Sequence, residues 1–159
     1  KGYPIALKCL KRIEKDFNIE IYGSGPQEQN IKKLIKKYNL EDKTIFKGYV
    51  DTRELATAMS SSNVFVAPYI RENASLMVSE ALYAGLPVVT ISNTGPSSVC
   101  SFFNSNLSKI SEGTGEELIE HLKKNIEYYL DNFIIENPKP TSNFDEDIVR
   151  EVEKITNTF

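Results

Sequence analysis

The sequence contains few of the residues that build disulfide frameworks or metal sites. Tryptophan is absent, and the 159 residues include only two cysteines, two methionines and one histidine. Cys9 and Cys100 give neither a disulfide framework nor a metal-binding spacing, and their apolar neighbours favour buried free thiols. No apolar run approaches the roughly 20 residues that a membrane-spanning helix needs. We expect no signal peptide, because Lys1 leads directly into an amphipathic segment.

Neither composition nor charge points to disorder or to nucleic acid. Apolar residues make up 40% and charged residues 26%, an ordinary mixture for one globular domain. The net charge of −3 argues against a general nucleic-acid-binding surface. The charge is uneven: residues 1–50 carry 11 Lys and Arg against 6 Asp and Glu, and residues 51–159 carry 8 against 16. This polarity favours anionic ligands near the N-terminal half.

Helical and strand-like segments alternate along the chain. Helical spacing of apolar residues predicts helices over 5–17, 31–38, 76–84, 114–130 and 145–155, and a capped helix start at Asp51. Short apolar runs predict strands over 18–22, 44–50, 63–67 and 87–91, whereas residues 100–109 fit neither pattern. Such alternation is typical of parallel βαβ units. The predicted fold is an α/β domain with an open, doubly wound parallel sheet, and ligands would bind at the carboxyl ends of its strands.

The first candidate site is the glycine-containing turn from Gly23 to Pro26. It stands between a predicted strand and a helix N-terminus, where glycine lets a phosphate or sugar approach the backbone and free N–H groups attract anions. The alternative is a purely structural β–α turn with proline at the first helical position. The segment is not a GxGxxG fingerprint, so it predicts no dinucleotide site.

The second candidate is a pair of carboxylates, Glu72 and Glu80, eight positions apart. Glu72 stands at the predicted start of a helix, and Glu80 falls about two turns further along, among apolar residues. A carboxylate in such a setting needs hydrogen-bond donors, and sugar hydroxyls are suitable ones. The alternatives are a helix-dipole partner for Glu72 and a solvated helix position for Glu80.

A third strand, loop and helix start runs from Ile91 to Ser98. Its two serines, Ser97 and Ser98, either cap the helix or bind phosphate, and capping alone is the simpler interpretation.

Taken in order, these segments resemble the C-terminal domain of group 1 glycosyltransferases, the family 4 retaining enzymes of the GT-B fold. The resemblance covers residues 1–99 continuously and implies a Rossmann-like half of that fold. Each motif is weak alone, but their order and spacing are specific. The matching segments are Lys1-Gly2, Gly23-Ser24-Gly25-Pro26, Phe46-Lys47-Gly48-Tyr49-Val50, Ala67-Pro68, Glu72 with seven residues before Glu80-Ala81, and Ala84-Gly85-Leu86-Pro87-Val88-Val89.

The resemblance implies a donor site for a nucleoside-diphosphate sugar, with UDP or GDP as the nucleotide. By this resemblance Glu80 binds the ribose hydroxyls, Glu72 faces hydroxyls of the donor sugar, and Lys1 contacts the diphosphate. The matching backbone stretches are Gly23 and Gly25 beside the donor, Gly48, Tyr49 and Val50 near the base, and Asn73, Ala74, Ser75 and Leu76 over the sugar and distal phosphate. No Asp-rich cluster is present, which fits a site that needs no metal and no cofactor.

The chain also departs from the family pattern. A strand and an arginine usually precede the lysine-glycine pair, so we expect residues 1–159 to form a single nucleotide-sugar-binding domain whose first strand is missing. An N-terminal acceptor domain would likewise lie outside this chain. Ala74 and Ser75 stand where an aromatic residue and a glycine are common, and Ser98 stands where a glutamate is common. These differences concern sugar preference and the geometry of the loops.

The expected function is retaining transfer of a hexose or its derivative to a glycan, a lipid-linked sugar or a protein. As a fragment, the chain should bind donor and transfer nothing. The alternatives are a nucleotide-sugar 2-epimerase and a non-catalytic partner domain of a glycosyltransferase. Free thiols fit a reducing, cytoplasmic compartment. The lysine-rich faces at Lys8, Lys11 and Lys15 and at residues 32–37 either contact an anionic membrane at its inner face or are simply solvated.

Overall fold

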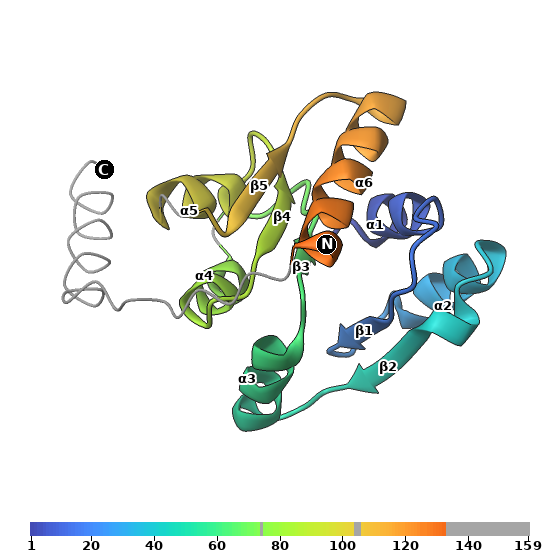
Figure 1. The fold of residues 1–159 in the computed structure, drawn as a ribbon. Helices are drawn as coiled ribbons and strands as arrows, with labels where there is room; N and C mark the ends of the chain where they lie inside the picture. Colours follow the sequence, from blue (N-terminus) through green and yellow to red (C-terminus); the bar gives the residue numbers. More distant parts are fainter. Residues whose placement is uncertain (74, 104–105, 133–159) are drawn as a thin grey trace.

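The computed structural model describes residues 1–73, 75–103 and 106–132, in which helices and strands alternate (Figure 1). This alternation confirms the α/β pattern expected from the sequence. The helices are α1 (Tyr3–Leu10), α2 (Glu28–Lys37), α3 (Thr52–Ser61), α4 (Leu76–Tyr83), α5 (Gly95–Phe103) and α6 (Gly115–Asp131), with a short 3₁₀ helix at Glu41–Lys43. The strands are β1 (Ile19–Tyr22), β2 (Thr44–Gly48), β3 (Phe65–Ala67), β4 (Val88–Ile91) and β5 (Ser108–Ser111).

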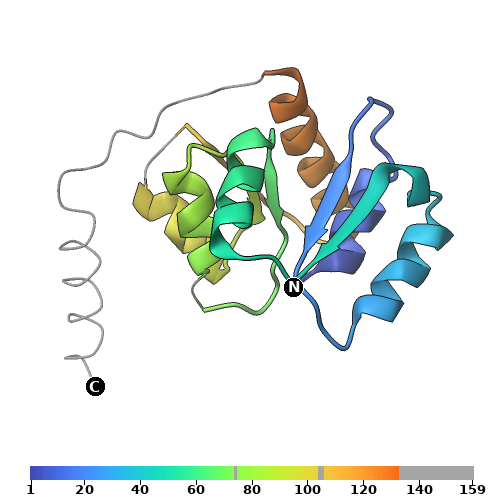
Figure 2. The same cartoon turned by 90° about the horizontal axis from the view of Figure 1, so that it is seen from below.

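All strand pairs are parallel, as predicted, but they form two sheets. One sheet pairs β1 with β2, and the other has the order β3-β4-β5. Figures 1 and 2 both show β1 and β3 as the neighbouring strands of the two groups. Among the described residues, each of these strands hydrogen-bonds along one edge only. The expected open sheet is therefore interrupted between β1 and β3.

Helices cover both faces of the strands, which confirms the doubly wound arrangement. β4 is buried along its whole length, and its adjacent residues Val88 and Val89 belong to two different hydrophobic clusters. Successive strand residues point to opposite faces, so a strand of this kind is covered on both sides. The first cluster joins α1, α2 and α6 to β1 and β4, and the second joins α3, α4 and α5 to β3 and β4.

Several boundaries differ from the sequence prediction. The helix expected to reach Phe17 ends at Leu10, because tight turns such as Ile13 N–H to the Leu10 carbonyl follow it. Ile13 and Phe17 still pack into the first cluster from this irregular segment. Asp51 caps α3 as predicted, accepting a hydrogen bond from the Glu54 N–H at 2.8 Å. The stretch 100–109 contains the end of α5 and the start of β5, and the helix expected over 145–155 lies outside the described residues.

Some of the N-terminal cations pair with carboxylates near the C-terminal end of the described chain. Helix α1 lies against α6. Lys8 of α1 and Arg12, two residues after its end, pair with carboxylates of α6 that are more than 100 positions away. Lys8 and Arg12 both bind Glu116, and Arg12 also binds Glu120 at 2.7 Å. Hydrogen bonds from Lys8 and Arg12 lower the pKa of Glu116 to about 2. These N-terminal cations therefore link α1 and the segment after it to α6. Their expected role in attracting anionic ligands or a membrane stays a prediction.

Both cysteines are buried, as predicted. Cys9 is 0% exposed and Cys100 is 1% exposed. Burial raises the pKa of Cys9 to about 12 and that of Cys100 to about 11, so both remain protonated thiols at neutral pH. Within the described ranges, none of the helices has the length and apolar character needed to cross a membrane. The lysines of α2 are exposed, and Lys32 pairs with Glu28; contact with a membrane stays a prediction.

Candidate functional site

Several of the candidate residues lie on loops that follow the strands. Because the paired strands are parallel, each sheet gathers the loops at the carboxyl ends of its strands at one edge. Gly23 follows β1, and its N–H donates to the carbonyl of Gly48, the last residue of β2, at 2.6 Å. Both glycines have positive φ angles, 99° and 68°, and neither would place a Cβ within 4 Å of another group. The backbone at these two turns is therefore open to a close-lying ligand.

The rest of this predicted region is also accessible. A Cβ added to Gly25 would meet nothing within 4 Å, Tyr49 is 86% exposed, and Val50 is half-buried. The exposed Tyr49 ring at the end of β2 could stack on a planar ligand. Whether Gly25, Tyr49 and Val50 contact a ligand stays a prediction.

Lys1 and Glu72, which are 71 positions apart in the sequence, form an ion pair. The Lys1 Nζ lies 2.8 Å from Glu72 Oε2 and 4.6 Å from the centre of the Tyr69 ring. Tyr69 follows β3 by two residues and is not among the site residues that the sequence predicts. Burial, aided by Tyr3 and the negative charge of Glu72, raises the pKa of Tyr69 to about 12. The ring therefore stays neutral and offers the Lys1 ammonium a cation–π contact.

Gly2 packs against Pro68 and thereby determines the position of the neighbouring Lys1. It is the N-cap of α1 with φ at 74°, and a Cβ built there would lie 1.8 Å from the carbonyl oxygen of Pro68. Both the left-handed conformation and the close approach exclude larger residues. The start of α1 is thereby held against the end of β3, which brings Lys1 to the loop that carries Glu72.

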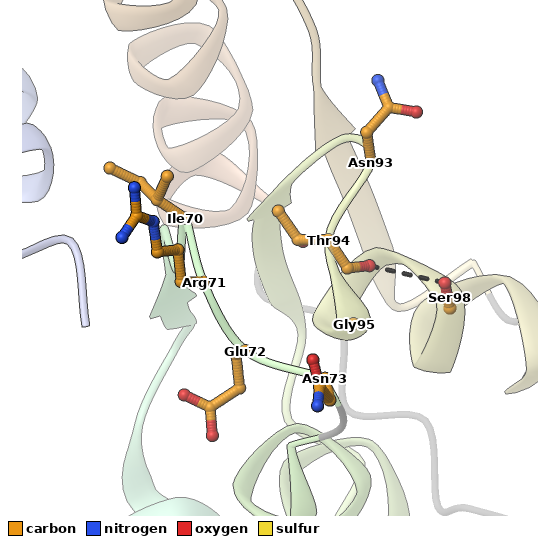
Figure 3. A pocket seen from close by; sticks show the side chains of 8 residues that line it. All are labelled: Ile70, Arg71, Glu72, Asn73, Asn93, Thr94, Gly95 and Ser98. Atoms are coloured by element: carbon orange, nitrogen blue, oxygen red, sulfur yellow. Dashed lines mark hydrogen bonds between the residues drawn. The ribbon is translucent and has the colours of Figure 1, made fainter.

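A pocket of about 560 Å³ opens between the β3–α4 loop and the start of α5 (Figure 3). Its lining is mostly polar, and side-chain amides and hydroxyls of this kind suit a ligand rich in hydroxyl groups. Glu72 and Asn73, two of the predicted site residues, belong to this lining, and their contact with a ligand stays a prediction. The lining residues are Ile70, Arg71, Glu72, Asn73, Asn93, Thr94, Gly95 and Ser98.

The N-terminus of α4 offers backbone donors next to this pocket. Ser75 is the N-cap of α4 and is buried, and its carbonyl accepts from the N–H groups of Val78 and Ser79. Among the described residues, the N–H groups of Leu76 and Met77 have no backbone acceptor. Donors at a helix start attract anions such as phosphate. Leu76 is 80% exposed, and Ala74 lies outside the described residues.

The N-terminus of α5, in contrast, is occupied by its own caps. The Thr94 N–H donates to the Ser97 hydroxyl at 3.0 Å, and the Ser97 N–H points back to the Thr94 hydroxyl at 3.4 Å. The Ser98 N–H donates to the Thr94 carbonyl, and Pro96 has no N–H. Of the two interpretations of Ser97, capping is therefore confirmed.

Glu80 lies on the exposed face of α4, one turn after Leu76. Its apolar neighbours Val78, Ala81 and Leu82 turn into the core, so the carboxylate itself remains in water. The sequence-based argument that Glu80 is buried among apolar residues is thus wrong, because helical geometry separates adjacent side chains by about 100°. Glu80 does not line the pocket, and its role in ligand binding stays a prediction.

Sequence comparison places these features in a known family. Residues 1–136 match the family model described as "Glycosyl transferases group 1". An uncharacterized glycosyltransferase of Haemophilus influenzae is 35% identical over 92 residues, which cover 56% of this chain and 26% of that protein. Protein CapJ of Staphylococcus aureus is 29% identical over an alignment of 163 positions, which covers 91% of this chain and 41% of that protein. The chain thus spans less than half the length of these relatives.

Solved structures support the same fold. WaaG, a glycosyltransferase involved in lipopolysaccharide biosynthesis, superposes on 83% of this chain and 35% of its own, with a TM-score of 0.71 and 18% identity. Sucrose-phosphate synthase from Thermosynechococcus elongatus covers 87% of this chain and 35% of its own, with a TM-score of 0.72 and 24% identity. Anabaena HepE, solved in complex with UDP, covers all of this chain and 46% of its own, with a TM-score of 0.59 and 14% identity. The architecture is that of a Rossmann-like half of the GT-B fold, and the chain belongs to the group 1 glycosyltransferases.

Proposed function

We propose that this chain binds the nucleoside-diphosphate sugar, with UDP or GDP as nucleotide, in a retaining glycosyltransferase of family 4. It corresponds to the C-terminal half of that enzyme. The observation that carries the proposal is the Lys1–Glu72 pair, 2.8 Å apart, beside a polar pocket and the backbone donors at the start of α4. One site thereby combines a cation, N–H groups for phosphate and a carboxylate for hydroxyls.

In this proposal the diphosphate lies between Lys1 and the start of α4. Negative charge builds on the diphosphate as the bond to the sugar breaks, and a fixed ammonium and oriented N–H groups stabilise that charge. Glu72 and Asn73 contact the sugar hydroxyls in the pocket. The centre of the Tyr69 ring lies 4.6 Å from the Lys1 Nζ. This cation–π contact holds the ammonium beside the loop that carries Glu72.

The nucleoside extends from the diphosphate towards the β1 and β2 turns. Gly23 and Gly25 leave room for the backbone to approach it, while Gly48, Tyr49 and Val50 lie near the base. Glu80 accepts hydrogen bonds from both ribose hydroxyls, because its exposed carboxylate is free to face a ligand on the surface of α4.

We further propose that a parallel strand preceding Lys1 fills the position between β1 and β3. Each of these strands is hydrogen-bonded along one edge only among the described residues, and α1 starts beside the end of β3. The acceptor, which is a glycan, a lipid-linked sugar or a protein, would bind to a separate N-terminal domain. The isolated chain then binds donor without transferring the sugar, because transfer needs donor and acceptor held together with water excluded. The buried thiols Cys9 and Cys100 fit a cytoplasmic enzyme.

The Glu80→Gln substitution tests this proposal. Charge-assisted hydrogen bonds contribute roughly 1.5–3 kcal/mol, so calorimetric titration with UDP and GDP should show at least about a tenfold loss of affinity for the nucleotide that binds. The melting temperature should not change, because the side chain is exposed. Glu127→Gln, on α6, serves as the control and should bind like the wild type. If Glu80→Gln binds the nucleotide with unchanged affinity, Glu80 does not contact the ribose.

A further inference from the structure

Gly95, the first residue of α5, packs directly against the backbone that carries Glu72. Its N–H donates to the Glu72 carbonyl at 2.9 Å. A Cβ built at Gly95 would lie 2.0 Å from the Asn73 carbonyl oxygen and 2.4 Å from the Glu72 carbonyl oxygen. Real Cβ atoms essentially never approach backbone atoms so closely, so any side chain at position 95 must displace one of the two segments.

The requirement for glycine at position 95 is steric. Gly2, Gly23 and Gly48 have positive φ angles, but Gly95 does not have one. Its backbone conformation would accept alanine, and only the space beside Glu72 and Asn73 is missing. Glycine is therefore required here because two loops of the pocket pack closely together, and not because the backbone adopts a left-handed conformation.

The start of α5 is the more buried of the two segments. Thr94 and Ser97 cap each other, and Pro96, Ser97 and Cys100 are buried. Cys100 packs in the second cluster, which also contains residues of α4 and β4. The β3–α4 loop is less tightly held, since Arg71 and Asn73 are exposed. A methyl group at position 95 would therefore move the Glu72 backbone and leave α5 in place.

We propose that Gly95 is a positioning residue, which sets the place of the Glu72 carboxylate through direct contact with its backbone. This inference rests on the proposed function, because it assumes that Glu72 binds the donor sugar. Displacement of the Glu72 backbone by even about 1 Å would misalign the hydrogen bonds to the sugar, which depend steeply on geometry. The atoms nearest to a Cβ at Gly95 belong to neither Lys1 nor the nucleoside contacts. Lys1 loses its ion pair with Glu72 when it binds the diphosphate, so a shift of Glu72 should change affinity for the bare diphosphate far less than affinity for the sugar nucleotide.

The test compares a sugar nucleotide with its bare nucleoside diphosphate, both titrated into the wild type and Gly95→Ala. The donor pair is the UDP or GDP compound with the highest wild-type affinity. Gly95→Ala should reduce affinity for the sugar nucleotide about tenfold, while affinity for the diphosphate stays within about twofold. Gly115→Ala is the matched control. Gly115 has φ at 55° and a Cβ added there would meet nothing within 4 Å, so the change strains the backbone without touching the pocket.

A second variant covers the case in which Gly95→Ala does not fold. Ser97→Ala removes the cap that holds the start of α5, and it should reduce the preference for the sugar nucleotide in the same direction by a smaller factor. Equal losses for both ligands would mean a merely structural role and would overturn the inference, as would an unchanged preference in both variants. A wild type that shows no preference for the sugar nucleotide would instead contradict the proposed role of Glu72.

Discussion

At the scale of single residues, the Lys1–Glu72 pair contributes little to folding. Half of the Lys1 side chain and a quarter of the Glu72 side chain are exposed, and such pairs stabilise a protein by about 0–1 kcal/mol. Breaking this ion pair therefore costs little free energy of folding, so Lys1 and Glu72 can each bind a ligand instead. In the proposed complex a diphosphate replaces Glu72 as the partner of Lys1, and Glu72 turns to the hydroxyls of the sugar.

The Glu72→Gln substitution should separate these two roles. Affinity for the sugar nucleotide should fall about tenfold, because a charge-assisted hydrogen bond to a hydroxyl becomes a neutral one. Affinity for the bare nucleoside diphosphate should stay the same or rise, because Lys1 loses a competing carboxylate. Calorimetric titration of both ligands measures this, with Glu41→Gln in the exposed 3₁₀ helix as control. Equal losses for the two ligands would contradict a contact between Glu72 and the donor sugar.

Sequence reasoning can reach some of these residues and not others. Lys1 and Glu72 fall into one site by resemblance alone, since no local pattern connects residues 71 positions apart. Tyr69 and Gly95 escape the sequence prediction. Gly95 stands in a strand, loop and helix pattern where glycine ordinarily indicates a turn. The structure shows that glycine is needed at position 95 because Asn73, in another loop, leaves no room for a side chain. A contact of this kind exists only in the folded chain.

At the scale of elements, the sequence predictions are most reliable where apolar residues repeat regularly. Strand β4 and helix α2 have clear patterns, and the structure contains both. Strand β5 escapes prediction because its sequence, Ser-Lys-Ile-Ser, contains a single apolar residue and lies at the edge of its sheet. Helix α5 begins with Gly-Pro-Ser-Ser, which are weak helix formers, and its caps and buried face compensate for them.

The edges of β1 and β3 that face each other lead to a prediction about stability. Fusing about five β-branched apolar residues directly before Lys1 should supply a strand that both edges can pair with. Burial of two apolar side chains contributes about 3 kcal/mol, which corresponds to a rise in Tm of roughly 6–12 °C for a chain of this length. Thermal unfolding followed by circular dichroism measures the change.

A fusion of the same length with alternating proline provides the control for this experiment. Proline removes backbone donors and cannot join a central strand, so this control should leave Tm unchanged. If both fusions raise Tm equally, or neither does, no strand belongs between β1 and β3.

At the scale of the whole molecule, charged side chains gather in two places, between α1 and α6 and around the pocket. Lys8 of α1 and Arg12, just after this helix, both pair with Glu116 of α6. At the pocket, the charge of Lys1 is supplemented by Arg71, which belongs to the lining. In the proposed complex, Lys1, Glu72 and the start of α4 form one wall of the donor site. The order of motifs in the sequence predicts that Lys1 and Glu72 meet the same donor, but the interruption of the sheet appears only in the structure.

The central claim is that this chain is a donor-binding domain, and equilibrium dialysis with radiolabelled UDP- and GDP-sugars tests it most directly. We predict saturable binding of one of these donors with a Kd between micromolar and millimolar, or about −8 to −4 kcal/mol, because one wall alone leaves the ligand half exposed. The recovered label should remain on the intact nucleotide sugar, with none transferred to an added acceptor extract. Turnover by the isolated chain would show that the site is complete without a second domain. Absence of saturable binding for every donor at millimolar concentration would contradict the claim itself.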